Sequence, residues 1–145
     1  MSERKQNKKI DKRAPVIVGV GDLVDRSKED GLNPQELLAK ACEHAIQDSG
    51  IKELSNHIDY VGVVRFTVDF LTATNQSNFQ YSNFPRTLAN KLNISAKNEV
   101  YAPMGGNSPQ VLLEDALVKI STGETDCALL SGGEALQTMI AKLKA

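Results

Sequence analysis

Short apolar runs alternate with amphipathic patterns along most of this chain. A continuous apolar run bounded by turn residues predicts a strand buried on both faces, whereas apolar residues three and four positions apart predict a helix. The pattern therefore predicts an α/β fold, with a mostly parallel sheet flanked by helices and joined by right-handed crossovers. The expected strands are 15–21, 58–66, 99–101 and 127–130, and the expected helices are 34–48, 86–92, 108–122 and 135–143.

The first expected helix carries strong local signals. Asn33 suits the N-cap, Pro34 the first helical position, and Glu36 completes a capping-box pattern. Cys42 lies on the apolar stripe of this helix, so we expect it in the core. His44 lies beside the stripe, which favours a flanking position over a ligand role.

The first expected strand contains Gly19 and Gly21, which suggest a dinucleotide-binding turn. The third glycine of that fingerprint is missing, because Val24 stands in its place, and residues 22–33 are too polar to open a helix there. A nucleotide-binding α/β domain therefore stays as an alternative with weak support.

The helix expected over 108–122 follows a glycine turn, Met104-Gly-Gly-Asn107. Ser108 is expected to cap the helix, with Pro109 at its first position. Free N–H groups and the positive end of the helix dipole make such a terminus suitable for an oxyanion, a thiolate or a phosphate. The expected apolar stripe consists of Leu112, Leu113, Ala116, Leu117 and Ile120.

Composition narrows the function classes. The chain has 145 residues, with 17 basic and 18 acidic side chains and a net charge of −1, which predicts neither a nucleic-acid nor a membrane partner. Two cysteines and two histidines, far apart, predict no disulfide framework and no metal site, and a cytoplasmic location is expected. Residues 1–14 read as a basic, disordered tail, and the polar stretch 67–82 as a functional loop or an interface.

Six sequence blocks stand out together along the chain. They are PVIVGVGD (15–22), PQELLAKACEHAIQDSG (34–50), IDYVGVVRF (58–66), NFPRTLANKL (83–92), VYAPMGGNSPQ (100–110) and GETDCALLSGGEAL (123–136). These blocks resemble the N-terminal part of the thiolase superfamily, closest to the branch often labelled acetyl-CoA acetyltransferase, from about residue 15 to residue 136. The resemblance implies a layered thiolase fold, acyl-CoA thioester ligands, an acyltransferase role in lipid metabolism, and a family that is usually dimeric.

The resemblance also exposes a departure from the family. Its nucleophilic cysteine should fall at about Gly106, but no residue in the turn can attack a thioester. Ser108 has no histidine near it in sequence, and Cys127 lies a helix-length away in an expected strand. We therefore predict no catalytic residue in this chain. The resemblance assigns substrate binding, as an oxyanion turn, to Gly105, Gly106, Asn107 and Ser108, with a CoA thioester as the ligand and no other cofactor.

The resemblance further implies that residues 15–145 form an incomplete thiolase-like domain, truncated before its last edge strand. The fourth strand should then lie at a sheet edge, and the 108–122 helix should lack cover. A homo-oligomer or a missing C-terminal half is the expected partner. Two functions follow from the resemblance: an acyl-CoA-binding domain that is inactive alone, or a structural or assembly module that binds no CoA.

Overall fold

The computed structural model describes residues 11–27, 31–67 and 83–144. Nearly all of the expected basic tail and of the polar stretch 67–82 lies outside the described residues, so both interpretations stay predictions. No helix in the described part is long and apolar enough to cross a membrane.

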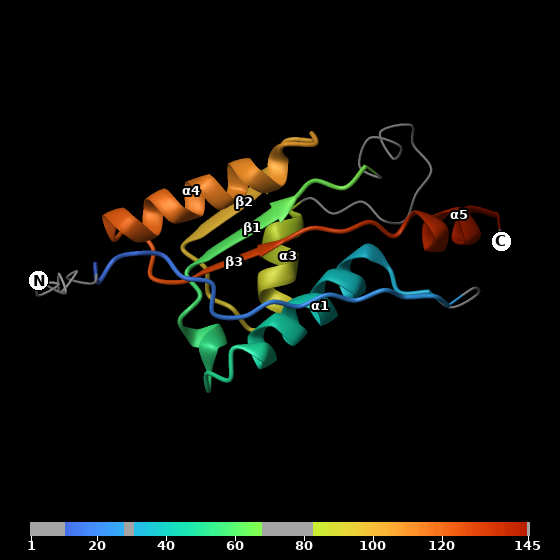
Figure 1. Ribbon diagram of the computed structural model, residues 1–145. Coiled ribbons are helices and arrows are strands. Elements are labelled where there is room, and N and C mark those ends of the chain that lie inside the picture. The colour runs from blue at the N-terminus through green and yellow to red at the C-terminus, as the bar shows by residue number, and fades with distance from the viewer. Residues whose placement is uncertain (1–10, 28–30, 68–82, 145) are drawn as a thin grey trace, which may run out of the picture.

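A three-stranded parallel sheet forms the centre of the molecule (Figure 1). Its order is β2-β1-β3, and Tyr60 in β1 lies opposite Asn98 on one side and Ala128 on the other. Helix α4 covers one face, while α1 and α3 cover the other. This confirms the predicted α/β class with a parallel sheet flanked by helices. The elements are α1 (Pro34–Asp48), η1 (Leu54–Asn56), β1 (Tyr60–Val64), α3 (Phe84–Lys91), β2 (Asn98–Ala102), α4 (Ser108–Thr122), β3 (Ala128–Ser131) and α5 (Leu136–Lys144).

Strand β1 is apolar throughout because both of its faces are covered. Val61 and Val63 are fully buried in the core that α1 and α3 complete. On the opposite face, Tyr60 donates a hydrogen bond of 2.7 Å from its hydroxyl to Oδ2 of Asp115 in α4. Burial and this carboxylate together raise the pKa of Tyr60, so the hydroxyl stays a donor.

Helix α1 begins where the sequence predicts. The side chain of Asn33 accepts from the Glu36 N–H at 2.9 Å, and the Glu36 carboxylate accepts from the Asn33 N–H at 3.0 Å. This reciprocal pair satisfies two N–H groups that would otherwise lack partners. Cys42 is buried in the core, as predicted, and the same apolar face carries Leu38 and Ala39.

The first expected strand, 15–21, is not part of the sheet, and that prediction is wrong. Residues 15–24, which we call the strap, run extended along α1 without pairing to any described strand (Figure 1). Val16 is 75% exposed and Ile17 is 80% exposed. The two edges of β1 are taken by β2 and β3, so residues 15–21 cannot pair with the central strand, and they pair with the outer edge of neither β2 nor β3.

Two glycines and two hydrogen bonds fix the strap on α1. A Cβ at Gly19 would collide with the backbone carbonyl of Ala45, and one at Gly21 with backbone atoms of α1. The Val20 N–H donates to Oδ2 of Asp48 at 2.9 Å, and Nδ1 of His44 lies 2.9 Å from the Asp22 carbonyl. His44 is thus an exposed flanking residue, as predicted.

Helix α4 faces the sheet with a narrower stripe than predicted. Leu112 and Ala116 are buried, whereas Leu113 and Leu117 of the same predicted apolar stripe are more than 40% exposed. Leu112 meets the sheet at Gly62, where a Cβ would lie 3.2 Å from one of its methyl groups. The missing side chain at this glycine sets which residues of α4 face inward.

Candidate ligand-binding site

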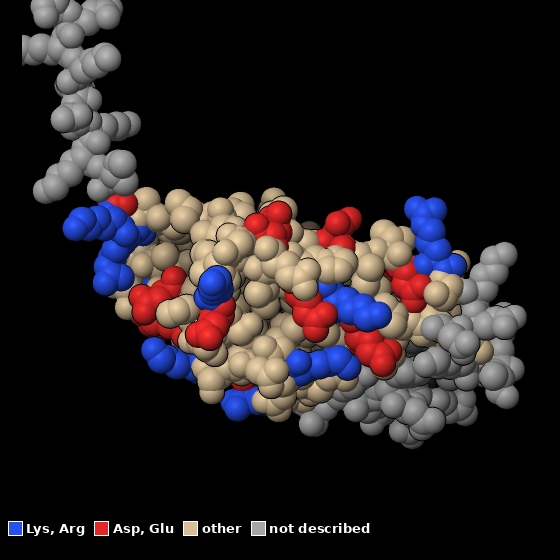
Figure 2. Space-filling view, turned by 90° about the horizontal axis from the view of Figure 1, so that it is seen from below, with Lys and Arg blue, Asp and Glu red and all other residues tan. Residues whose placement is uncertain are grey.

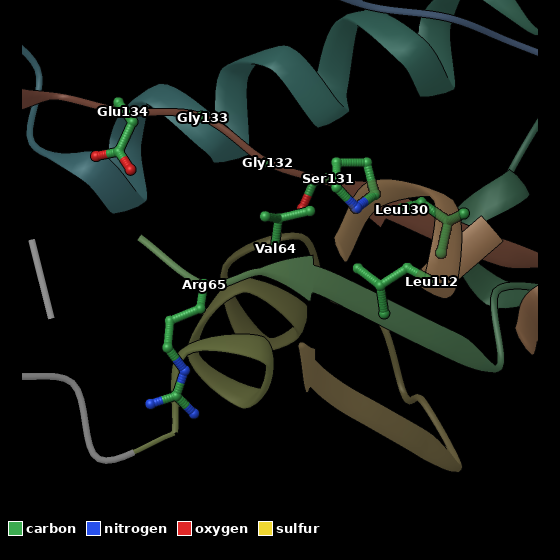
Figure 3. Close-up of a pocket in the computed structure, with 9 residues that line it drawn as sticks. Val64, Arg65, Leu112, Leu130, Ser131, Gly132, Gly133 and Glu134 are labelled. Carbon is green, nitrogen blue, oxygen red and sulfur yellow. The ribbon is translucent and has the colours of Figure 1, made fainter. Parts of the chain in front are cut away.

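A cavity of about 510 Å³ opens at the carboxyl ends of β1 and β3, beside the first turn of α4 (Figure 3). This position follows from the topology, because parallel strands end at a common edge of the sheet and α4 begins there. The volume lies in the range of small-molecule sites. The lining residues are Val64, Arg65, Pro109, Leu112, Leu130, Ser131, Gly132, Gly133 and Glu134.

The apolar and the charged parts of the lining are separated. Figure 3 shows the aliphatic side chains of Val64, Leu112 and Leu130 together, with the charged groups of Arg65 and Glu134 away from them. Such a lining suits a ligand with an apolar group at one end and a polar group at the other.

The charged side chains at this edge already have partners. The Arg65 guanidinium lies over the Tyr101 ring, 4.5 Å from its centroid. Oε1 of Glu134 accepts the N–H of Thr67 at 2.6 Å, which ties the end of β1 to the segment after β3. The two charges therefore hold the rim of the cavity in place.

Ser131 is the serine among the lining residues. Its Oγ is buried and has no hydrogen-bond partner of ordinary geometry in the described part of the chain. Burial raises the pKa of the Cys42 thiol to about 11, and the Ser131 hydroxyl opposes that rise. Cys42 therefore remains a protonated thiol at neutral pH and is no nucleophile.

Two glycines shape the wall after β3. A Cβ at Gly132 would lie 3.0 Å from Cβ of Val64, and one at Gly133 would lie 3.0 Å from a methyl group of Leu38. Larger residues would push this segment away from β1 and α1. The pair therefore keeps the wall close to the strand ends.

The predicted oxyanion turn lies next to this cavity without lining it. Gly105, Gly106 and Asn107 are exposed, and of the adjoining helix only Pro109 and Leu112 reach the cavity. A Cβ at Gly106 would meet no atom within 4 Å, so position 106 has room for a side chain. Substrate binding by this turn stays a prediction.

Ser108 differs from its predicted part in the helix start. Asn107 is the N-cap residue and Ser108 the first helical residue, so the predicted Ser108 cap, with Pro109 in the first position, is one residue out of register. The Ser108 side chain is buried, with Oγ donating to the Pro103 carbonyl at 2.5 Å and the N–H donating to the Gly105 carbonyl at 3.0 Å. Both donors of Ser108 therefore already have acceptors. A ligand at this helix start would have to bond to the N–H groups of the preceding turn instead.

The remaining candidate residues lie away from the cavity or in the core. Gly21 packs against the body of α1, far from its first turn, so the nucleotide-binding alternative lacks the strand–turn–helix geometry it needs. Cys127 is half-buried just before β3, and burial raises the pKa of its thiol. The described residues contain no cluster of His, Cys, Asp and Glu that could hold a metal ion.

Sequence reasoning missed Ser131, Arg65 and Glu134 as members of one site. The available signal was the pair Gly132-Gly133 at the end of the strand expected over 127–130, since glycines at the carboxyl end of a parallel strand often border a ligand site.

Comparison with known proteins identifies the fold. No known protein-family profile matches this chain, and no curated protein sequence matches it. Among solved structures, a monomeric SCP2-thiolase like protein type 1 from Mycobacterium smegmatis matches with a TM-score of 0.70 and 31% sequence identity. The fold is thiolase-like. The match covers 86% of this chain and 24% of that protein, so the chain spans about a quarter of its structural relative.

Proposed function

We propose that this chain is an acyl-CoA thioester-binding domain of the thiolase type, of the acetyl-CoA acetyltransferase branch, and that it binds without transferring the acyl group. The observation that carries this proposal is the cavity at the carboxyl ends of β1 and β3, beside the first turn of α4, in a thiolase-like fold. An acyl-CoA thioester matches this lining, because its acyl chain is apolar and its carbonyl, next to that chain, accepts hydrogen bonds.

Each part of the site has a separate role in this proposal. Leu112, Leu130 and Val64 contact the acyl chain. The Ser131 hydroxyl and the N–H groups of the turn 105–107 donate to the thioester carbonyl, where the dipole of α4 favours negative charge. Transfer would require a thiolate or a base-activated hydroxyl near that carbonyl. Ser108 cannot supply one, because its hydroxyl is held by the Pro103 carbonyl.

Isothermal titration of the full chain with acetyl-CoA and butyryl-CoA tests binding. We expect Ser131→Ala to weaken the affinity about fivefold, since one hydrogen bond to a ligand contributes roughly 1 kcal/mol. Ser121→Ala is the matched control, because Ser121 is exposed on α4 and bonds only the Val118 carbonyl. Equal affinities for both variants, or no detectable heat with the unmodified chain, would reject acyl-CoA binding at this cavity.

A second experiment tests the position of the thioester. Gly106→Cys places a thiol where the chain has room for a side chain and where the dipole of α4 lowers a thiol pKa. We expect this variant to become acetylated by acetyl-CoA, as detected by intact-protein mass spectrometry, and Ser121→Cys at the other end of α4 to remain unmodified. Equal labelling of the two thiols would mean that no thioester is directed to the turn.

A structural or assembly role without CoA binding is the second candidate, and helix α4 favours it. Val111, Leu113, Leu117 and Val118 are exposed on the flanks of this helix, and apolar side chains on several sides are typical of a helix with further cover. The proposed cover is a C-terminal half like the remainder of the longer relative, or another copy of the chain. Co-expression with such a half should protect α4 from amide exchange, whether or not acyl-CoA binds.

A further inference from the structure

Arg65 is a cation at the rim of the cavity whose guanidinium donates to no oxygen of the described residues. It is the first residue after β1, and it lines the cavity beside Val64, which belongs to the apolar part of the lining. The residue is exposed, and within the described part of the chain its guanidinium interacts with the Tyr101 ring alone. A guanidinium carries its N–H donors in a fixed fork that matches an oxyanion. These donors can therefore bind a ligand.

The Tyr101 ring is a rigid support for this guanidinium, whose central carbon lies 4.5 Å from the ring centroid. The ring lies nearly parallel to that of Phe84, at an angle of 13° with 6.0 Å between the centroids, and the Tyr101 hydroxyl accepts the Phe66 N–H at 3.4 Å. Phe84 and Phe66 are both buried in the core. The cation thus rests on a ring that the core holds in place, which lowers the entropic cost of binding an anion there.

Two carboxylates on the neighbouring elements bind other groups and do not neutralise Arg65. Glu99 of β2 pairs with Arg86, whose Nε lies 2.7 Å from Oε1 of Glu99. Glu134 accepts the Thr67 N–H, and Figure 3 shows its carboxylate apart from the Arg65 guanidinium. Figure 2 shows acidic and basic side chains interspersed on the face seen from below, without an extended basic area among the described residues. Because the whole chain carries a net charge of −1, an anion at the cavity is attracted by Arg65 itself and not by the overall charge.

We propose that Arg65 recognises an anionic group of the ligand, so that the cavity takes molecules in which an apolar chain is joined to a carboxylate or a phosphate. The apolar chain lies against Val64, Leu112 and Leu130, and the guanidinium N–H groups donate to two oxygens of the anion. Anion recognition rests on the proposed function, because both place the ligand in this cavity, and it adds the charge that the ligand must carry. In an acyl-CoA the anion is either a carboxylate at the far end of the acyl group or a phosphate of CoA.

Isothermal titration of the full chain with octanoate and with octanol tests this role, because the two probes share an alkyl chain and differ in charge. We expect Arg65→Gln to weaken octanoate binding at least about tenfold, since hydrogen bonds to a charged group are stronger than neutral ones. Octanol binding should be the same in both proteins. Added salt should weaken octanoate binding to the unmodified chain but not to Arg65→Gln. Arg26→Gln is the matched control, because Arg26 is also exposed and lies outside the cavity lining.

Anion recognition by Arg65 is overturned if the unmodified chain does not bind octanoate, if Arg65→Gln leaves the affinity unchanged, or if Arg26→Gln lowers it as much. Equal weakening of octanol and octanoate would also overturn it, because the loss would then come from packing at the rim and not from charge. Arg65→Lys keeps the charge without the fork, so it should recover only part of the octanoate affinity, and full recovery would contradict binding through two oxygens. Thermal unfolding checks that each variant is folded.

Glutaryl-CoA and butyryl-CoA identify the source of the anion and separate Arg65 from the proposed function. If Arg65→Gln weakens glutaryl-CoA binding and leaves butyryl-CoA binding unchanged, the anion is the acyl carboxylate. Equal weakening of both means that Arg65 binds a phosphate of CoA. If neither thioester binds while octanoate binding still depends on Arg65, the acyl-CoA proposal fails and anion recognition stands. If both thioesters bind but octanoate binding does not depend on Arg65, the acyl-CoA proposal stands and anion recognition by Arg65 fails.

Discussion

Two segments of nearly the same composition differ completely in burial in this protein. The strap contains VIVGV at residues 16–20, and β1 consists of YVGVV at residues 60–64. Val61 and Val63 of β1 have no exposed surface, whereas Val16 and Ile17 of the strap are among the most exposed large aliphatic residues. Local composition is therefore nearly the same in the two segments and does not account for the difference in burial.

The difference in burial comes from the structural elements that surround each segment. Strand β1 has a paired strand on each edge, a helix on one face and two helices on the other. The strap is fixed on α1 by two glycines and two hydrogen bonds, and it pairs with no described strand. An apolar run becomes a central strand only where other elements complete its surroundings, and this comparison can be tested by mutation.

The largest expected difference comes from a buried charge. Val61→Asp places a carboxylate without partners in the core, and we expect it to reduce the free energy of unfolding by about 4 kcal/mol or more. Val16→Asp, in the strap, should change it by less than about 0.5 kcal/mol. Urea unfolding followed by circular dichroism measures both. Similar losses in the two variants would mean that the strap is as buried as β1.

A smaller effect is expected at the glycine of β1. A Cβ at Gly62 would lie 2.9 Å from a methyl group of Leu130 and 3.0 Å from the Tyr60 ring. We expect Gly62→Ala to destabilise the fold by about 1–3 kcal/mol, because the contact between α4 and the sheet must widen. Gly106→Ala is the control, since position 106 is open. Thermal unfolding of the pair checks the prediction, which an unchanged Gly62→Ala variant would refute.

The glycines of the strap should have a local effect instead. Gly19→Ala brings a Cβ against the Ala45 carbonyl, so the strap must lift from α1 and the hydrogen bond from Val20 to Asp48 is lost. We expect global stability to fall by less than about 1 kcal/mol, because the strap buries little, while amide exchange at Val20 accelerates. Hydrogen-exchange mass spectrometry measures this. Unchanged exchange, with Val24→Ala as the reference variant, would show that the glycines do not hold the strap.

The smallest effect concerns Asp25, which follows the strap. The Leu32 N–H at 2.6 Å, together with donors of Ser27, lowers the pKa of Asp25 to about 2. This is below the ordinary value of about 3.9, so the hydrogen bonds to ionised Asp25 stabilise the folded chain above about pH 4. That contribution is lost as the pH falls through about 2. NMR titration of the Asp25 carboxyl carbon should give the low value, and Asp25→Ala should remove the pH dependence of exchange at Leu32. An ordinary titration would mean that these hydrogen bonds do not form in solution.

Some features of the candidate site were predictable from the sequence, and others were not. Motifs predicted the thiolase-like fold, and the Gly105–Ser108 turn does lie at the carboxyl edge of the sheet. The cavity beside it was not predictable, because Arg65 and Ser131 are 66 positions apart in sequence and meet only through the pairing of β1 with β3. Periodicity gave one broad apolar stripe on α4, and only the contact of Leu112 with the sheet at Gly62 shows which part of that stripe faces inward.

The sequence by itself determined the start of α1, the strand character of β1, and the absence of a thiol from the turn before α4. Those features depend on residues that are close together in the sequence, such as Asn33 and Glu36. Only the tertiary structure decided that the strap lies on α1, that β3 lies next to β1, and that Ser131 faces a cavity. Pairing and burial depend on which distant segments compete for the same sheet edge, and a local pattern carries no information about its competitors.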